Sequence, residues 1–562
     1  MLLLLLAYPP LYAQQPVEDL KQQFAAFQQL APQEKLFVHT DKNFYLTGET
    51  IWFKLYHVDA GSHKTSDISK VAYVEILNHE AKPVMQVKVG LHVNNGSGDG
   101  SFILPAHLAS GTYQLRAYTQ WMKNFDASYY FNKTLSIVNT SVRPDWLSLE
   151  KREAYHVQFF PEGGNLVYGL QSRIGFKITD QYGKGVEGNG VIIDQKNNAT
   201  RFYTSRFGIG SFSFLPVAGS DYKVSVTLNN GKMFTASLPA VYKEGYVMNV
   251  SEVDKDRVRI TATSTNNANT ILYLLGHTRQ QVKVALGERI NNGKAEWTIN
   301  KDQLGEGVSH FTLFNENRQP VCERLYFRRP VSKLNIGVTA GAGEYKTRSE
   351  VSLNLNTQNE KAQPVKGELS LSVFLLDSLQ TADQQTIDSY LWLASDLNGT
   401  IESPAYYFSD SSAEVNRAID DLLLTHGWRR FRWEDVKSKP VFNFLPEYEG
   451  LTIHAKVVDK QSGAPGRGIV SYLSVADENF QASNAVSNEK GEARFVMGNV
   501  FGPNELVAQT DSNSNRYRIE LQDPFAGKPD ALVLPRFNLT DKWKEQLNLH
   551  HLNARISNSY QP

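Results

Sequence analysis

One turn-and-strand pattern occurs four times along this chain of 562 residues, and it limits what the chain can fold into. Each copy has a glycine, an aromatic residue four positions later, a second glycine turn and another apolar segment. The copies begin at Gly98, Gly208, Gly293 and Gly491. Glycine permits tight turns, and period-two alternation is typical of strands with one buried face. The spacing is roughly one domain length, or two between the last copies, which predicts tandem β-sandwiches.

The composition agrees with packed β-cores in several domains. Apolar residues make up 41% of the chain and aromatic residues 11%. A chain of this length should hold four to six domains of about 100–150 residues. The formal net charge is zero and no basic tract stands out. Nothing therefore favours nucleic acid or anionic lipid as a partner.

The N-terminus predicts an exported protein. Residues 1–13 form a short apolar run that ends at Ala13 and resembles a signal peptide, although the missing positive charge leaves open a start upstream of Met1. No later segment reaches the roughly 20 apolar residues of a membrane helix. Cys322 is the sole cysteine, so an intrachain disulfide is excluded. These features favour the periplasm or outer-membrane surface of a Gram-negative bacterium.

The segment 14–33 predicts an amphipathic helix. Its apolar stripe consists of Leu20, Phe24, Phe27 and Leu30, and Pro32 follows its end. We expect this stripe to pack on the first sandwich, because Lys21 alone gives an anionic membrane little to bind.

The first sandwich carries a motif that resembles a known family. The order T-D-K-x-x-Y-x-x-G-E-T-h-x-F-K is formed by Thr40, Asp41, Lys42, Tyr45, Gly48, Glu49, Thr50, Phe53 and Lys54. It is similar to the opening of a macroglobulin domain, the β-sandwich module of α2-macroglobulins and their bacterial relatives. Residues 311–315 with 320–327, and residues 368–378, resemble later strands of that family. The resemblance covers residues 34–380 and implies a fold rather than a chemistry.

Linkers and composition divide the chain further. The expected fold class is mainly β, as tandem Ig-like or macroglobulin-like β-sandwiches with a helical insertion near 380–436. The predicted parts are a signal peptide (1–13), the helix (14–33), sandwiches at 34–142, 143–245 and 246–330, a fourth sandwich with the helical insert (331–445), a further module (446–525) and a C-terminal helix and tail (526–562).

The helical insert contains the candidate docking residues. Ser411 and Glu414 predict a capping box for a helix whose apolar face is Val415, Ile419, Leu422 and Leu423, with Gly427 as its stop. The aromatic residues Trp428, Phe431 and Trp433 follow directly. They either seal a gap between sandwiches or form a docking surface for a protein partner.

The module at 446–525 resembles the carboxypeptidase regulatory-like module, which is a small sandwich without a peptidase site. The resemblance rests on alternating Ile453, Ala455 and Val457, a turn from Asp459 to Gly463, and Pro465. Macroglobulin-type sandwiches, this module and the 426–431 segment together resemble large Bacteroidetes envelope proteins. Those relatives often continue into a TonB-receptor plug, which these 562 residues lack, so the chain could be a truncated form.

No catalytic, cofactor-binding or metal-binding residue is predicted. Cys322 is flanked by Val and Glu rather than the Cys-Gly-Glu-Gln of a thioester, and is expected to be a buried small side chain. The thirteen histidines form no metal-binding motif. There is neither a nucleophile elbow nor a phosphate-binding loop.

The sequence therefore predicts a non-catalytic, exported scaffold or protein-binding protein of the bacterial envelope. Its expected partner is an envelope protein, such as a TonB-linked transporter. One alternative is a macroglobulin-type endopeptidase inhibitor without a thioester, for which the partner would be a protease. A second alternative is a carbohydrate-binding array, suggested by the tryptophans Trp121, Trp146, Trp392, Trp428 and Trp433.

Overall fold

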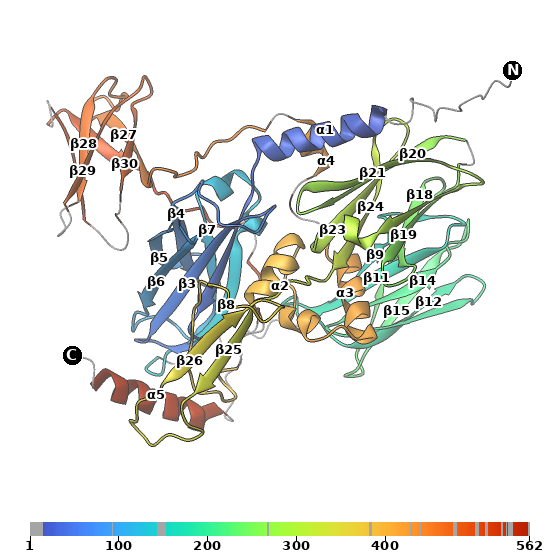
Figure 1. Ribbon diagram of the computed structural model, residues 1–562, viewed down its shortest axis with the longest axis horizontal. Helices are drawn as coiled ribbons and strands as arrows, with labels where there is room; N and C mark the ends of the chain where they lie inside the picture. The colour runs from blue at the N-terminus through green and yellow to red at the C-terminus, as the bar shows by residue number, and fades with distance from the viewer. Residues whose placement is uncertain are drawn as a thin grey trace.

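The structure is a computed structural model and is built mainly from small β-sheets (Figure 1). It describes residues 15–92, 94–142, 153–266, 269–381, 385–427, 430, 432–438, 440–475, 480–498, 500, 505–511, 515–529, 532–535, 537 and 543–559. The predicted fold class is confirmed. The predicted signal peptide lies outside the described residues.

The first three sandwiches occupy residues 34–328. In chain order the strands of the first are β1 (Glu34–Thr40), β2 (Phe44–Leu46), β3 (Thr50–Asp59), β4 (Val71–Leu77), β5 (Pro83–Gly90), β6 (Ser97–Ile103), β7 (Gly111–Tyr118) and β8 (Phe131–Val138). Those of the second are β9 (Tyr155–Pro161), β10 (Leu166–Val167), β11 (Ser172–Asp180), β12 (Gly188–Asp194), β13 (Ala199–Tyr203), β14 (Ile209–Phe214), β15 (Tyr222–Leu228), β16 (Met233–Ala236) and β17 (Val241–Tyr242). Those of the third are β18 (Tyr246–Glu252), β19 (Arg257–Ser264), β20 (Ile271–Thr278), β21 (Gln281–Arg289), β22 (Lys294–Asn300), β23 (Gly307–Phe314) and β24 (Pro320–Arg328).

These three sandwiches share one topology. Apart from the short β2, β10 and β17, each has seven strands in two sheets. The first, second and fifth strands form one sheet, with the second in the middle: β1-β3-β6, β9-β11-β14 and β18-β19-β22. The other four strands form the facing sheet, in the order fourth, third, sixth and seventh strand: β5-β4-β7-β8, β13-β12-β15-β16 and β21-β20-β23-β24. The recurring glycine–aromatic pattern lies on the fifth strand and leads into the sixth, so it marks the crossing between the two sheets.

A smaller sandwich follows later in the chain and stands at the upper left of Figure 1. Its sheets are β30-β27-β32 and β29-β28-β31. The strand bounds are β27 (Leu451–Asp459), β28 (Val470–Val475), β29 (Gln481–Val486), β30 (Glu492–Met497), β31 (Leu506–Thr510) and β32 (Tyr517–Leu521). Its copy of the recurring pattern again crosses between sheets, from β30 to β31.

The sequence predicts a fourth sandwich over 331–445, but the structure forms only part of it. Two strands, β25 (Asn335–Ala340) and β26 (Leu353–Gln358), make an isolated antiparallel sheet. Among the described residues of 359–445 there is no further strand. Alternation of apolar residues in the sequence indicates where strands can form. Whether these strands become a closed sandwich depends on the other strands that must pair with them.

The described residues also form helices and short 3-10 turns. They are α1 (Gln15–Leu30), α2 (Ile387–Trp392), α3 (Ala413–Thr425), α4 (Trp433–Lys437) and α5 (Lys544–Ser559), with 3-10 turns at Trp121–Asn124, Ala127–Tyr129, Lys301–Gln303, Ala394–Asp396 and Pro404–Phe408. Helix α3 begins one residue later than predicted: Ser412 is the N-cap and accepts a hydrogen bond from the Val415 N–H at 3.3 Å. Ser411 and Glu414 therefore do not form the predicted capping box.

Helix α1 packs differently from the expectation. Its residues Leu20, Phe24 and Phe27 are buried mainly against the outer side of the third sandwich and α4, and of the first sandwich only Phe125 is among the described residues of this cluster. Phe24 stacks on His277 of β20 with ring centroids 4.9 Å apart. Leu30 is exposed. The amphipathic pattern predicts a buried face but carries no information about which surface covers it.

Candidate functional site

Helix α3 lies between the second and third sandwiches (Figure 1) and joins them. The predicted apolar face, Val415, Ile419, Leu422 and Leu423, is buried. It contacts β9, β11 and β14 on one side and β24 on the other. Asp420 and Asp421 lie in the same part of α3 and are acidic. Helix α3 therefore presents carboxylates to both sandwiches at once.

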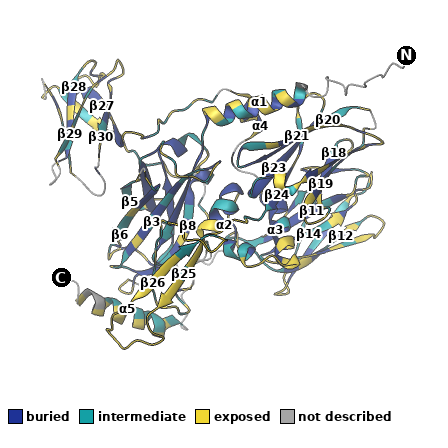
Figure 2. Cartoon of the chain, viewed as in Figure 1, coloured by how far each residue is buried: buried dark blue, intermediate teal, exposed yellow. Residues whose placement is uncertain are grey.

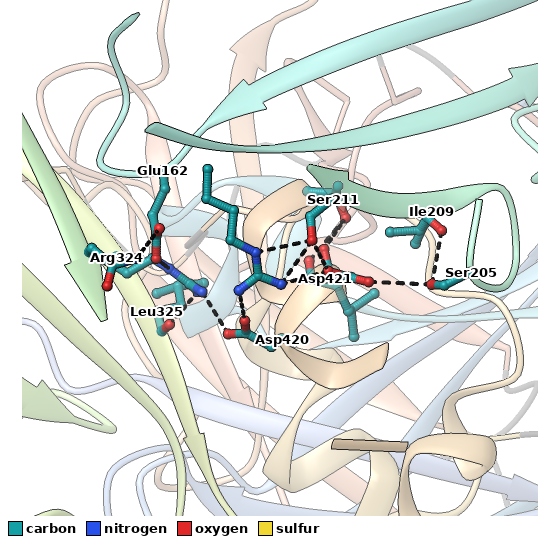
Figure 3. Close-up of polar contacts among 12 residues, drawn as sticks. Glu162, Ser205, Ile209, Ser211, Arg324, Leu325, Asp420 and Asp421 are labelled. Carbon is teal, nitrogen blue, oxygen red and sulfur yellow. Dashed lines mark hydrogen bonds and ion pairs between the residues drawn. The ribbon is translucent and has the colours of Figure 1, made fainter. Parts of the chain in front are cut away.

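Two arginines bind these carboxylates (Figure 3). Arg324 of β24 donates from Nη2 to Asp420 at 2.6 Å and from Nε to Glu162 at 2.8 Å. Arg173 of β11 pairs with Asp420 and donates from Nη2 to Asp421 at 2.8 Å. Each arginine thus contacts α3 from a different sandwich, and the group acts as a clamp.

The clamp is electrostatically satisfied. Burial alone would raise the pKa of Asp420, but the guanidinium groups of Arg324 and Arg173 outweigh it and hold this pKa below its usual value. The same carboxylates raise the pKa of Arg324 despite its burial. Asp420 and Arg324 are therefore charged at neutral pH and paired, which suits a structural contact better than proton transfer.

Two cavities flank α3, of about 550 and 850 Å³. The larger is lined by polar groups that already bind one another: Glu252 accepts from the Tyr326 hydroxyl at 3.0 Å and pairs with Lys301 at 3.0 Å. Within the described ranges, no group of three or more His, Cys, Asp or Glu side chains could hold a metal ion. Cys322, as predicted, is buried on β24 in the core of the third sandwich.

Of the three predicted docking residues, the structure describes only one. Trp428 and Phe431 lie outside the described residues. Trp433 is 3% exposed and is packed between Phe24 of α1 and Phe314 of β23. Its indole N–H donates to the Thr312 hydroxyl at 2.9 Å. Trp433 therefore lies in the contact between α1 and the third sandwich and does not offer an exposed surface.

The tryptophans of the carbohydrate alternative form no common surface in the described part of the chain. Trp121 is buried and donates to the Pro32 carbonyl at 2.6 Å. Trp392 is half-buried under the guanidinium of Arg279, and Trp146 lies outside the described residues.

A second polar centre joins the first sandwich to the helical insert. Lys35 of β1 is fully buried and its Nζ lies 2.9 Å from Asp396 Oδ1 and 3.2 Å from His63 Nε2. Burial lowers the pKa of Lys35 to about 7; Asp396 opposes this shift, and nearby Arg430 reinforces it. The insert thus contacts all three sandwiches through buried ionisable groups.

The β25-β26 sheet is the place where packing is incomplete. One of its faces carries Ile336, Val338, Leu353 and Leu355, which are 36–52% exposed (Figure 2). The opposite face carries mainly Asn and Thr. Such alternation normally faces a core. Here no second sheet covers the apolar face among the described residues.

The segment 366–376 adds to this uncovered surface. Its inner side binds the first sandwich: Ser370 Oγ lies 2.6 Å from His39 Nδ1 and accepts from the Tyr56 hydroxyl at 2.8 Å. Its outer side exposes Leu371, Val373 and Leu375. No backbone–backbone hydrogen bond joins it to any described residue. We call the β25-β26 apolar face and this outer side the open face.

Alternation at 351–355 correctly predicts β26, although it gives no indication that β26 is uncovered. The segment 368–378 was expected to be a strand from the family resemblance, but its described residues form no strand. The clamp was missed because neither Asp420 nor Asp421 belongs to a motif. Their partners lie almost 100 residues or more away, and sequence spacing gives no indication of such contacts.

No protein-family model and no curated protein matches the chain. Solved structures similar to it include dimeric latent PorU from Porphyromonas gingivalis (TM-score 0.25, 11% identity, 52% of this chain and 34% of that chain). Others are Escherichia coli alpha-2-macroglobulin activated by porcine elastase (0.20, 10%, 87% and 43%) and Salmonella alpha-2-macroglobulin reacted with methylamine (0.17, 10%, 87% and 39%). The chain thus spans less than half of each of these proteins. These TM-scores are too low to support a fold assignment. The fold is therefore assigned from the observed sheets and not from these comparisons.

Proposed function

We propose that this protein is a non-catalytic, protein-binding scaffold, and that the open face is where a partner protein docks. One observation supports this above the others. Four sandwiches in the described chain cover their apolar faces with a second sheet, whereas the open face exposes a patterned apolar surface. Large contiguous apolar patches on folded proteins mark interaction sites.

The rigid arrangement around the open face suits this role. The clamp at α3 and the Lys35 centre fix the three sandwiches relative to the insert. The 366–376 segment is held on the first sandwich by the Lys54–Glu368 ion pair and the Ser370 contacts. A preorganised surface loses little conformational entropy when a partner binds, which favours affinity.

We extend the proposal to the location. We place the protein outside the cytoplasm, in a Gram-negative envelope beside a TonB-linked outer-membrane transporter. The apolar run at 1–13 and the resemblance to Bacteroidetes envelope proteins support this. In the described part of the chain, no helix is both long and apolar enough to cross a membrane. Fractionation of the producing cells tests this part, and recovery with cytoplasmic proteins would contradict it.

Site-specific photocrosslinking in the producing cell tests the docking role. A photoreactive residue at Val373 should give a discrete adduct with one polypeptide. The matched control is Val441, because both valines are 81% exposed and Val441 lies in a linker away from the open face. The substitution Val373→Lys should weaken binding of the purified adduct partner by about tenfold or more, since a charge would enter an apolar contact. Equal adducts from both positions, or none from Val373, would reject the proposal.

A further inference from the structure

The open face corresponds to the beginning of a sandwich of the kind already formed three times. β25 and β26 pair antiparallel, as do the first and second strands of each complete sandwich. The end of β26 bridges to the next segment at Gln358–Pro364, as Thr179 bridges Gly185 in the second sandwich. Residues 366–376 then follow in the place of the third strand. The places of the fourth to seventh strands have no occupant among the described residues.

The fifth strand has a fixed neighbour. It pairs antiparallel with the second strand in every complete sandwich: β6 with β3, β14 with β11 and β22 with β19. Its aromatic residue lies opposite an isoleucine each time, in the pairs Phe102–Ile51, Phe212–Ile174 and Trp297–Ile260. The C-terminal module repeats this with Phe495 opposite Ile453. Aromatic and β-branched residues stabilise such cross-strand pairs.

The corresponding position on β26 can be identified. Ile174 and Ile453 each lie five residues before the bridging residue of their strand, Thr179 and Val458, whereas Ile51 lies seven before Val58. The second sandwich is the guide here, because Thr179–Gly185 and Gln358–Pro364 are bridges of the same separation. Five residues before Gln358 lies Leu353. Its side chain belongs to the open face, so an aromatic residue opposite it would cover that face.

On the required edge of β26, Leu353 and Leu355 have no backbone hydrogen-bond partner among the described residues. Gly341 N–H donates to the Ser352 carbonyl, which sets the alternation of the β25-β26 ladder. Leu353 and Leu355 therefore direct their N–H and C=O groups away from β25. Thr357 does the same, and its carbonyl accepts from the Val365 N–H. Only another polypeptide strand can pair with a row of alternating donors and acceptors.

Building on the proposed function, we propose that the partner protein donates an extended strand that pairs antiparallel with β26 along Leu353 and Leu355. The strand carries an aromatic residue opposite Leu353 and a glycine about four residues before it, as the fifth strands of this chain do. The partner is thus recognised by backbone pairing and by one aromatic side chain, with further apolar strands completing the cover.

A synthetic peptide with the sequence of residues 291–300 is a suitable probe, because it contains a glycine and Trp297 in this spacing. We expect saturable binding to the full chain by fluorescence anisotropy. Leu355→Pro removes one edge N–H without breaking the β25-β26 ladder and should weaken binding at least about tenfold. Val338→Pro is the matched control, since Val338 lies on the same face but directs its N–H to the opposite edge of the sheet. It should bind almost as the unmodified chain does.

Several outcomes would overturn the inference. These are no saturable binding up to roughly 1 mM peptide, equal losses in both proline variants, or no loss in Leu355→Pro. A dimer in sedimentation that disappears in Leu355→Pro would also overturn it, by making a second copy of the chain the occupant. If Leu355→Pro still forms the Val373 adduct in cells, the docking role stands and strand pairing fails. If the unmodified chain forms no adduct, the docking role itself fails.

Discussion

Lys35 illustrates how much a single buried charge can influence this molecule. It lies on β1, beneath the helical insert, and the charged groups that face it are Asp396, Arg430 and Arg279, with His63 beside it. Its ammonium group gains one carboxylate partner, which only partly offsets the loss of water. The residue therefore contributes to holding the insert in place but makes the folded state sensitive to pH.

We expect stability to rise with pH above neutrality because of Lys35. Its pKa is about 7 in the folded chain and 10.5 ordinarily, so between these values the unfolded chain holds a proton that the folded chain has lost. Linkage then requires the free energy of unfolding to increase with pH in this window, by at most about 1.4 kcal/mol per unit. Urea unfolding of the unmodified chain and of Lys35→Met at pH 7, 8 and 9 measures this. Parallel pH profiles for the two would contradict it.

At this scale the sequence predicts residue types better than residue roles. Cys322 was expected to be buried, and it is. Trp433 was a candidate docking residue as part of the aromatic cluster that follows the predicted helix, yet α1 covers it. Nothing in the sequence indicated that Lys35 is buried, because a lysine in a strand is ordinarily exposed. The burial of Lys35 depends on a segment far away in the sequence, which contains Asp396.

At the scale of elements, α3 shows how one helix can connect two domains. Its apolar stripe and its N-terminal serine were readable from the sequence, and only the capping position differed by one residue. The strands that α3 contacts could not be predicted from the sequence. Strand β24 and strand β11 each contribute an arginine to the same turn of α3, and this convergence exists only once both sandwiches are folded.

Breaking the clamp should be costly. Arg324→Met leaves Glu162 buried without its cation, and removing one partner of a buried pair typically costs about 3–5 kcal/mol. Arg318→Ala is the control: Arg318 pairs with Asp19 of α1 at 2.9 Å, but both side chains are largely exposed. That loss should cost no more than about 1 kcal/mol. Denaturant unfolding of the full chain compares them, and similar costs for both variants would contradict the role of the clamp.

At the scale of the whole molecule, the C-terminal module is attached to the first sandwich by two segments. One contains Glu447, whose Oε1 accepts from the Tyr73 hydroxyl at 3.0 Å and from the Thr452 N–H at 2.7 Å. The other contains Phe525, whose ring meets Tyr73 edge-on at 5.3 Å. Figure 1 shows the module standing apart from the other sandwiches, so these contacts set its position.

Glu447 should make this attachment depend on pH. Burial raises its pKa from 4.5 to about 7. Between these values the folded chain holds a proton that the unfolded chain has lost, so this contribution to stability falls as pH rises from 4.5 to 7. We expect small-angle scattering to show a larger maximum dimension at pH 8 than at pH 5.5. Glu447→Gln, which stays neutral, should remove the difference. An unchanged difference in that variant would contradict the role of Glu447.

The sequence was most informative about architecture. Glycine turns and alternation are local properties, so the repeated sandwiches and the C-terminal module could be expected from them. The partial sandwich at 335–376 could not, because alternation at Leu353 and Leu355 is the same whether or not other strands cover it. Long-range pairing decides this, and it is absent from any local pattern.

The helical insert is positioned late in the chain although it fixes the three early sandwiches. A polypeptide made from its N-terminus presents residues 34–328 before α2, α3 and Arg430 exist, and domains generally fold as units in that order. The three sandwiches would therefore first fold as independent domains. They would become a rigid body only when the insert emerges, which makes its arrival the moment of assembly.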